Sequence, residues 1–451
     1  MRKMGILNLP YGQGTLSVEI PSRNLRTLVE AKSMPWLEEA SFQSALSKAL
    51  DNPVGTLPLS QIASKGKKVA IIIDDHERPG TPTARMLTPI IERLVDGGLR
   101  FEDIEVVMAT GTHEKPAKEQ VQAKVGPELS NRLKVQVHYA LEKESLSFLG
   151  VSRLGTPIWV NRHVSEADVR IGVGGIVPHP WAGYGGGGKI IMPGVSAWEA
   201  VGKHHLLALS EESRIGKIEG NPFREDAEDI ARSVGLDFIV NAVLNDRRET
   251  VAFFAGDFIK AHRLGASLSK HIFENPSASK VDILIMAYGP RDETLWQIIG
   301  NAFTLVLAEQ VVKKGGTVIL IASCHEGIYR FGKGIHHLNY KGDETGHDSL
   351  LEMLKEGMRP EEILSETIRG NIAYPELGVK GYLISKLAAS RRIVLVSRAF
   401  EAKEISWLGS IAHGAKEALE EALKTHGRDA EVIVVPRAST SRAFPRVQET
   451  P

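Results

Sequence analysis

The amino-acid sequence predicts an α/β protein with two α/β domains, mainly parallel sheets and an active site in the cleft between them. Its length of 451 residues exceeds what one hydrophobic core usually holds. Short, continuous apolar runs recur with helix-sized segments between them, which is typical of parallel strands covered on both faces. A composition of 42% hydrophobic and 24% charged residues is that of an ordinary globular protein.

The first predicted element is a hairpin over residues 4–20, where apolar and polar residues alternate around Gly12 and Gly14. Strands follow at 68–74, 104–110, 169–177, 281–287, 316–322, 391–397 and 430–436. The pattern is interrupted at 265–280, before a new strand starts. We therefore expect one domain over 1–270, a second over 278–430, and a loose tail over 437–451.

Composition excludes several classes of function. The chain has 55 Lys plus Arg residues and 55 Asp plus Glu residues, so it has no net charge. Binding to nucleic acid or to a membrane surface is therefore not indicated. The single cysteine, Cys324, excludes a disulfide framework and a cysteine-based metal cluster. The sequence shows neither a signal peptide nor a run of ~18 apolar residues. We expect a cytoplasmic protein.

Polar side chains stand where three of the predicted strands end. They are Asp75, Arg78, His113, His179 and Lys189. Taken singly, such residues are typical of turn chemistry or of hydrogen-bonded core histidines. The carboxyl ends of parallel strands meet at one edge of a sheet, which is where ligands bind. Together these residues therefore indicate a functional site.

The loop "GYGGGGKIIMPG" (183–194) matches the start of a phosphate-binding P-loop, G-x-x-x-x-G-K. A P-loop continues with Ser or Thr, which binds magnesium, and opens a long helix. Here Ile190 takes that position, and Pro193 and Gly194 would interrupt the helix. The sequence therefore disfavours a P-loop.

The same loop suggests a different role for its residues. Gly186, Gly187 and Gly188 would let the backbone approach a flat or phosphorylated ligand closely. Lys189 at the end of the loop is a candidate for covalent attachment. In the helix predicted after the loop, His205 lies on the apolar stripe, whereas His204 points off it and is expected to meet solvent.

These motifs resemble the lactate racemase family, whose enzymes use a nickel-pincer nucleotide. The family's D-D-x-T-R-P, G-T-H and H-x-x-x-G-x-x-G-G-x-K-x-x-x-P-G elements are matched by "DDHERP", "GTH" and "HPWAGYGGGGKIIMPG". The stretches "GNPFRED" (220–226) and "GPRDETLWQ" (289–297) are also similar. The resemblance covers most of residues 5–300, and the long glycine-lysine signature is its most specific part.

The resemblance implies a cofactor, pyridinium-3,5-bisthiocarboxylic acid mononucleotide nickel, joined covalently to Lys189 and supplied by a cofactor-synthesis machinery. Its two sulfurs, a ring carbon and one protein histidine hold the nickel, and the matching histidine is His205. Asp75, Arg78 and the glycines Gly186, Gly187 and Gly188 are then expected to bind the cofactor. The sulfur ligands arrive with the cofactor, which agrees with a chain that has one cysteine.

The resemblance also implies a reaction on a small-molecule 2-hydroxy acid, within a catalytic domain over 1–270. A histidine takes the hydroxyl proton while the hydride from Cα moves to the cofactor, and the hydride returns to the other face of the keto intermediate. His113 and His179 match the two bases. Arg78 holds either the substrate carboxylate or the cofactor phosphate. Gln297, from the domain over 278–430, contributes to the substrate pocket.

The sequence departs from the family at two positions in these motifs. Glu77 stands where the family has Thr, and Gly300 stands where lactate-specific members have a lysine. The tryptophan that lactate enzymes carry later in the C-terminal domain has no clear equivalent. Glycine vacates volume and removes a positive charge, so we expect racemase or epimerase chemistry on a 2-hydroxy acid larger than lactate.

Two other functions compete with this one. A zinc-type hydrolase would use His113, His179 and Asp75, but it would give the glycine-lysine signature no role. A non-catalytic nucleotide-binding protein would make the strand-end histidines incidental. Only the racemase predicts an adduct on one lysine.

Overall fold

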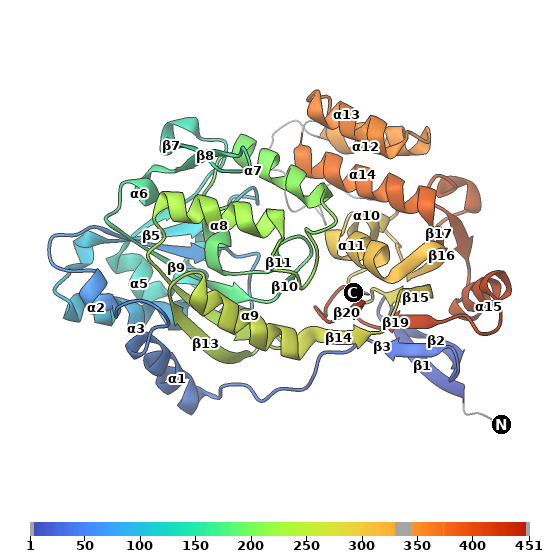
Figure 1. Ribbon diagram of the computed structural model, residues 1–451, viewed down its shortest axis with the longest axis horizontal. Coiled ribbons are helices and arrows are strands. Elements are labelled where there is room, and N and C mark those ends of the chain that lie inside the picture. The colour runs from blue at the N-terminus through green and yellow to red at the C-terminus, as the bar shows by residue number, and fades with distance from the viewer. Residues whose placement is uncertain (1–3, 330–343, 373, 448–451) are drawn as a thin grey trace. The chain divides into compact units, whose positions relative to one another are not determined.

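The computed structural model describes residues 4–329, 344–372 and 374–447, which form two compact units. We call Ser33–Ile272 the central unit. The terminal unit combines the N-terminal segment up to Lys32 with the described residues from Phe273 onward. Each unit is built around one six-stranded sheet, and Figure 1 shows their elements.

The sheet of the central unit is parallel except for one edge strand. Its strand order is β13 (Thr250–Gly256), β12 (Phe238–Leu244), β9 (Val169–Ile176), β4 (Val69–Asp74), β5 (Ile104–Ala109) and β6 (Lys134–Val137). Only β12 and β13 pair antiparallel. The strands predicted at 68–74, 104–110 and 169–177 are confirmed as β4, β5 and β9, which lie next to one another.

Helices cover both faces of this sheet. Ile71 and Ile73 of β4 pack in one core with α1 (Glu39–Asp51) and α3 (Thr83–Asp96). Ile72 packs in a second core with α7 (Trp198–His205) and α8 (Pro222–Val234). Successive residues of a strand face opposite sides, so an unbroken apolar run serves both cores. Figure 1 shows α1 and α3 on one side of the sheet and α8 on the other.

Shorter elements complete the central unit. The further helices are α2 (Leu59–Ile62), α4 (Lys118–Val125), α5 (Pro127–Arg132), α6 (Arg162–Ser165) and α9 (Lys260–Phe273). Two-stranded pieces are formed by β7 (Leu146–Val151) with β8 (Pro157–Asn161), and by β10 (Pro178–His179) with β11 (Gly183–Tyr184).

The terminal unit has a fully parallel sheet. Its order is β18 (Ser410–Ala412), β17 (Arg392–Val396), β16 (Val312–Ile321), β15 (Val281–Ala287), β19 (Val432–Val435) and β3 (Leu25–Leu28). Around it lie the hairpin β1 (Met4–Tyr11) and β2 (Gly14–Pro21), the pair β14 (Glu274–Ser277) and β20 (Phe444–Val447), and helices α10 (Leu295–Ile299), α11 (Ala302–Val311), α12 (Glu344–Lys355), α13 (Pro360–Ile368), α14 (Pro375–Ser390) and α15 (Ala415–His426).

The unit boundaries differ from the predicted domains 1–270 and 278–430 at both ends of the chain. The hairpin packs its buried Leu9 and Ile20 into the core of the terminal unit, and β3 pairs with β19. Residues 437–447 do not form the loose tail predicted over 437–451, because Phe444 is buried and β20 pairs with β14. Residues 448–451 lie outside the described residues.

The predicted fold class is confirmed: both units are α/β, and their six-stranded sheets are mainly parallel. Within the described part of the chain, no helix combines the length and the hydropathy needed to span a membrane.

Candidate active site

A hydrogen-bonded histidine-carboxylate pair lies at the ends of β4 and β5. His113 Nδ1 is 2.6 Å from Asp75 Oδ2, and Asp75 is buried while the His113 side chain keeps 17% of its surface exposed. A left-handed Gly111 turns the chain after β5, and its N–H donates to the carbonyl of Gly194. The turn places His113 beside Asp75.

The partner of His113 fixes which of its ring nitrogens carries the proton. Burial raises the pKa of the Asp75 carboxyl, but the hydrogen bond and charge of His113, with Arg78 and His76, hold that pKa below its ordinary value. An ionised carboxylate only accepts, so Nδ1–H of His113 donates to it. In the neutral ring, Nε2 then presents a lone pair. His113 is therefore arranged as a proton acceptor at Nε2.

The other predicted residues of this strand end have different surroundings. Arg78 is exposed, and its Nη1 donates to the Glu77 carbonyl. Asp74 has a structural role, because its Oδ1 forms an ion pair at 2.8 Å with the buried Lys124. The Nζ of Lys124 also donates a hydrogen bond to the Arg78 carbonyl. Nothing in the sequence singles out Lys124, because a lysine on a helix is normally exposed.

His179 follows β9 and is held in the opposite tautomer from His113. Its Nδ1 accepts the backbone N–H groups of Trp181 at 3.2 Å and Ala182 at 3.1 Å. The proton of the neutral ring therefore resides on Nε2. Burial lowers the pKa of His179 well below its ordinary value, and the charges of Lys189 and Arg78 lower it further.

Lys189 does not open a long helix. It lies in a single 3₁₀ turn, Gly187–Ile190, and α7 begins at Trp198. A P-loop is therefore excluded, as the sequence predicted. The Lys189 Nζ lies 5.2 Å from the centroid of the Phe223 ring, at cation–π distance.

The loop glycines are required by packing against the protein itself. A Cβ on Gly186 would lie 2.8 Å from Asn241 Oδ1, one on Gly187 would lie 3.0 Å from the ring of His262, and one on Gly188 would lie 3.1 Å from the Ala227 carbonyl oxygen. Protein atoms therefore fill the sides on which we expected these glycines to leave room for a ligand. Contact between the loop backbone and a cofactor stays a prediction.

Three residues that hold this loop were not identified as site residues from the sequence. Arg224 is fully buried and donates to the carbonyls of Ala182, Tyr184 and Gly186. Burial lowers the pKa of Arg224 to about 10. Asn221 donates to the Trp181 carbonyl at 2.8 Å, and His262 Nε2 lies 2.8 Å from the Gly185 carbonyl oxygen. The signal for Arg224 and Asn221 was the "GNPFRED" stretch.

Both histidines of α7 are buried. His205 is 6% exposed, and its Nδ1 lies 2.7 Å from the Val201 carbonyl. The prediction that His204 meets solvent is wrong: it is fully buried, and its Nδ1 lies 2.9 Å from the buried Asp226. The helical wheel failed because α8 supplies a polar partner on the flank of α7 that a periodicity argument treats as solvent.

Phe223 is the centre of a cluster of aromatic rings. Ring centroids of His204, His205, Trp181 and His179 lie 4.1, 5.2, 5.8 and 6.2 Å from that of Phe223. In the described part of the chain, His204 Nε2 and Trp181 Nε1 are buried without a hydrogen-bond partner. Buried polar atoms are normally satisfied, so these two fit a site that takes a further group beside Lys189.

Gln297 belongs to the terminal unit, where it caps α10. Its Oε1 accepts the Thr294 N–H at 2.9 Å, and the Thr294 hydroxyl accepts the Gln297 N–H. Gly300 follows, and a Cβ there would lie 2.8 Å from the indole of Trp296. Trp296 thus fills the space next to Gly300 that we expected to be vacant.

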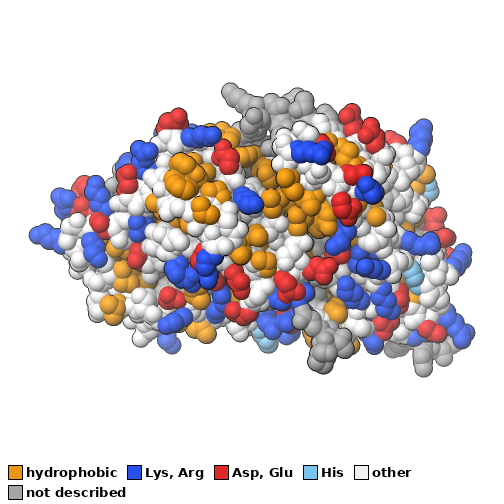
Figure 2. Space-filling model, turned by 45° about the horizontal axis from the view of Figure 1, so that its top comes forward, with side chains coloured by type: hydrophobic (Ala, Val, Ile, Leu, Met, Phe, Trp, Pro, Cys, Tyr) orange, Lys and Arg blue, Asp and Glu red, His pale blue; other side chains and the backbone are white. Residues whose placement is uncertain are grey.

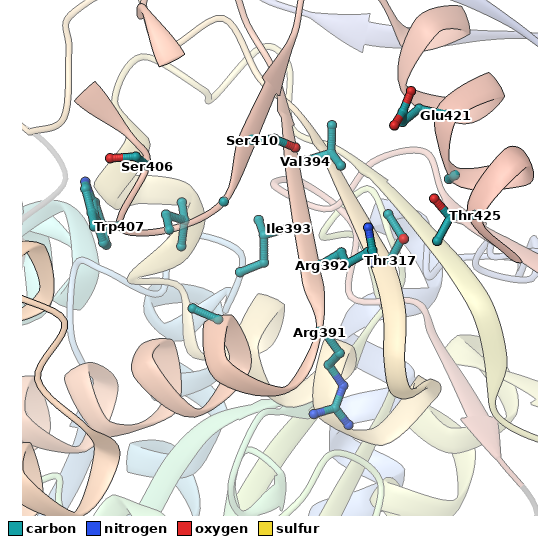
Figure 3. A pocket seen from close by; sticks show the side chains of 14 residues that line it. Thr317, Arg391, Arg392, Ile393, Val394, Ser406, Trp407, Ser410, Glu421 and Thr425 are labelled. Carbon is teal, nitrogen blue, oxygen red and sulfur yellow. The ribbon is translucent and has the colours of Figure 1, made fainter. Parts of the chain in front are cut away.

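A polar cavity of about 320 Å³ lies elsewhere in the terminal unit (Figure 3). Its lining includes Thr317, Arg392, Trp407 and Glu421, and none of the predicted site residues. Arg391 also borders it but turns its guanidinium away, toward the Val312 carbonyl.

Among the residues that the structure describes, no group of three or more His, Cys, Asp or Glu side chains is arranged to hold a metal ion. The hydrolase alternative needs Asp75, His113 and His179 as zinc ligands. Asp75 and His113 instead bond to each other, and Nδ1 of His179 is occupied by backbone N–H groups.

Comparison with known proteins gives consistent results. The family model of the lactate racemase N-terminal domain matches residues 11–216. The lactate racemase of Lactiplantibacillus plantarum is 27% identical, over 96% of this chain and 98% of the relative. That of Thermoanaerobacterium thermosaccharolyticum is 24% identical, over 96% and 98%.

Solved structures agree with the fold. The lactate racemase apoprotein from Thermoanaerobacterium thermosaccharolyticum matches with a TM-score of 0.81 at 23% identity, over 98% of this chain and 100% of that one. A protein from Thermotoga maritima matches with a TM-score of 0.61 at 20% identity, over 92% and 100%.

Proposed function

Because the chain belongs to the lactate racemase family, we propose that it is an isomerase that racemises or epimerises a 2-hydroxy acid with a nickel-pincer nucleotide attached to Lys189. The observation that carries the proposal is the pair of histidines after β5 and β9, the strands on either side of β4. β5, β4 and β9 are adjacent in one sheet and lead to His113, Asp75 and His179. The charge of Arg78 lowers the pKa of both Asp75 and His179, which places these groups in one electrostatic neighbourhood.

The residues around Phe223 fit the proposed cofactor. Lys189 would carry it, and His205 would bind its nickel, because a backbone carbonyl on Nδ1 is the usual partner of a metal-binding imidazole. The unpartnered Trp181 Nε1–H can donate to it, and the unpartnered His204 Nε2 can accept from it. When bound, the cofactor supplies the hydride acceptor. Asp75, Arg78 and the backbone of Gly186, Gly187 and Gly188 are proposed as its further contacts.

The two proposed catalytic histidines carry their proton on different ring nitrogens before the reaction. His113 accepts the hydroxyl proton at Nε2, and Asp75 stabilises the imidazolium that forms. His179 presents Nε2–H and donates a hydrogen bond to the substrate oxygen. To act as base for the opposite enantiomer, His179 must move its proton to Nδ1 and give up its bonds to Trp181 and Ala182. The proton transfers at His113 and at His179 therefore meet different barriers.

We also propose a substrate larger than lactate. Position 300 lacks the lysine of lactate-specific relatives, so the substrate carboxylate depends on Arg78 or another cation, and Gln297 is a proposed contact. The buried indole of Trp296 fills the space beside Gly300, so the proposal rests on the lost charge and not on a vacated volume. An unpaired carboxylate is costly, so lactate would bind poorly, whereas a longer acid with several hydroxyls can offset that cost with further hydrogen bonds.

A panel of chiral 2-hydroxy acids, including both lactates and several sugar acids, tests the proposal on nickel-loaded protein. Chiral chromatography should detect epimerisation of at least one larger acid and little or none of lactate. His113→Ala and His179→Ala should each lower the rate about 10²–10⁴-fold, whereas His163→Ala, a change at a partly exposed histidine after β8, should not. Efficient lactate racemisation would overturn the substrate proposal, and no epimerisation of any acid would overturn the function.

A further inference from the structure

His76 lies in a tight turn between two residues of the proposed site. The Arg78 N–H donates to the Asp75 carbonyl at 3.1 Å, which closes a β-turn directly after β4. His76 and Glu77 are the two central residues of this turn. The Arg78 carbonyl in turn accepts a hydrogen bond from the buried Lys124 at 2.7 Å. The turn is therefore fixed, and it holds the side chain of His76 beside the site.

The imidazole of His76 has a buried nitrogen that the described residues leave unsatisfied. Its side chain is only 15% exposed. Its Nδ1 is buried and has no hydrogen-bond partner in the described part of the chain. Buried polar atoms are normally paired, so an unpaired nitrogen beside a proposed site is explained by a group that a ligand brings.

Glu77 determines which hydrogen-bonding group His76 presents. Its Oε1 lies 3.6 Å from His76 Nε2, within ion-pair distance. A carboxylate beside Nε2 favours the proton on that nitrogen, so the neutral ring has a lone pair on Nδ1. The ligand group that meets Nδ1 must therefore donate a proton. Glu77 is one of the two departures from the family's motifs, and the threonine of the family would place no carboxylate there.

A hydroxyl is the donor that a hydroxy acid can offer to this nitrogen. In the proposed reaction the 2-hydroxyl is assigned to His113 and His179, and an ionised carboxylate only accepts hydrogen bonds. Lactate has no further donor, whereas an acid with a 3-hydroxyl has one next to the reacting carbon. His76 directly follows Asp75, the hydrogen-bond partner of His113. Neighbouring groups of the protein would then bind neighbouring hydroxyls of the substrate.

The charges around the turn agree with this placement. Burial raises the pKa of the Asp75 carboxyl, but the hydrogen bond and charge of His113, with the charges of Arg78 and His76, hold that pKa below its ordinary value. On a larger scale, Lys and Arg side chains are interspersed with Asp and Glu over the face shown in Figure 2. A hydroxyl carries no net charge, so its recognition depends on a local group such as His76 and not on a field over the surface.

We propose that His76 is a specificity-determining residue whose Nδ1 accepts a hydrogen bond from the 3-hydroxyl of the substrate, which makes the substrate a 2,3-dihydroxy acid. This inference rests on the proposed function, and it names the class of acid that the lost charge at position 300 leaves open. An acid without the 3-hydroxyl leaves a buried acceptor unpaired, which lowers its affinity about tenfold or more.

Binding of acids that differ in one hydroxyl tests the proposal. Threonic and erythronic acid carry the 3-hydroxyl in its two relative configurations, and their 3-deoxy counterpart has the same length without it. Isothermal titration calorimetry on the cofactor-loaded protein gives the apparent dissociation constants, whether or not the acids are epimerised. Wild type should bind the better of the two trihydroxy acids about tenfold or more tightly than the 3-deoxy acid.

Variants at position 76 separate a hydrogen bond from a purely structural role. His76→Leu cannot accept a hydrogen bond and should reduce the preference to about twofold or less. His76→Asn, whose Oδ1 can take the place of Nδ1, should retain a preference. His163→Leu, at a partly exposed histidine that pairs with Glu105, is the matched control and should keep the full preference. Circular dichroism checks that each variant is folded, and general damage to the site would weaken all three acids alike.

The outcomes distinguish this inference from the proposed function. Equal or undetectable binding of the three acids by wild type would overturn the role of His76, as would an unchanged preference in folded His76→Leu. Either result leaves the proposed function to the epimerisation panel. A preference that His76→Leu abolishes would support the 3-hydroxyl contact. If neither trihydroxy acid were epimerised in that case, the binding role of His76 would stand and the proposed function would not.

Discussion

His113 and His179 follow β5 and β9, the two strands that flank β4, yet their partners hold them in opposite tautomers. A carboxylate on Nδ1 leaves His113 ready to accept a proton at Nε2. Two backbone N–H groups on Nδ1 leave His179 ready to donate from Nε2. The sequence predicts both histidines but not this difference, because His179 takes its partners from the backbone, which carries no sequence signal.

Another buried histidine, His138, has a structural role. Its Nε2 lies 3.0 Å from the carbonyl oxygen of Ser196, just before α7. Burial lowers the pKa of His138 to about 4, against the opposing effect of that hydrogen bond. An unfolded histidine titrates near 6.5. Below pH ~6.5 the unfolded chain therefore binds more protons than the folded one. The stabilising contribution of neutral His138 is complete above pH ~6.5 and is lost as pH falls toward 4.

His138→Gln should reduce this pH dependence. Glutamine stays neutral, so the difference in unfolding free energy between wild type and variant should shrink by about 3 kcal/mol between pH 7 and pH 4. Urea unfolding at a series of pH values measures it. The other buried histidines are present in both proteins, so their contributions cancel in the difference. Parallel stability curves for the two proteins would contradict the assignment.

At the scale of elements, the glycine loop is fixed by α8 and α9. Gly183 has φ +74° and packs so tightly that a Cβ would overlap the carbonyl of Lys217. Gly155, in the β7–β8 turn, has φ +84° but nothing within 4 Å of its Cβ position. Both glycines adopt the left-handed backbone conformation. Only at Gly183 would a Cβ also overlap neighbouring atoms.

The two glycines form a matched pair for mutation. Gly155→Ala should cost about 1–2 kcal/mol of stability, from the left-handed backbone alone. Gly183→Ala should cost about 1–3 kcal/mol more, because the new methyl group overlaps a backbone carbonyl. Denaturant unfolding compares them. Equal losses for the two variants would show that close packing at Gly183 contributes nothing.

The strands and the hairpin could be predicted from the sequence better than the order in which they pair and the cores on which they pack. Unbroken apolar runs such as 68–74 identify buried parallel strands, because only a sheet covered on both faces needs them. The order of strands within each sheet does not follow from such runs. The hairpin at 4–20 is predicted by alternation, but its packing on the core of the terminal unit depends on contacts with residues far along the chain. Buried Arg224, Lys124 and His262 were missed because their partners are backbone carbonyls or distant side chains.

At the scale of the whole molecule, the relatives match nearly the full chain, with 96% of it aligned to each of two lactate racemases. The residues proposed to hold the cofactor match the family signature, whereas Gly300 departs from lactate-specific members. Under the proposed function, the change at position 300 would alter the acid that binds and leave the chemistry unchanged.

The most direct test of the central claim is the intact mass of the protein coexpressed with cofactor-synthesis proteins. Wild type should carry an adduct of several hundred daltons, and peptide mapping should place it on Lys189. Lys203→Ala, at an exposed lysine of α7, should carry the same adduct, and Lys189→Ala should be folded and free of it. A Lys189→Ala protein that retains the full adduct would contradict the account.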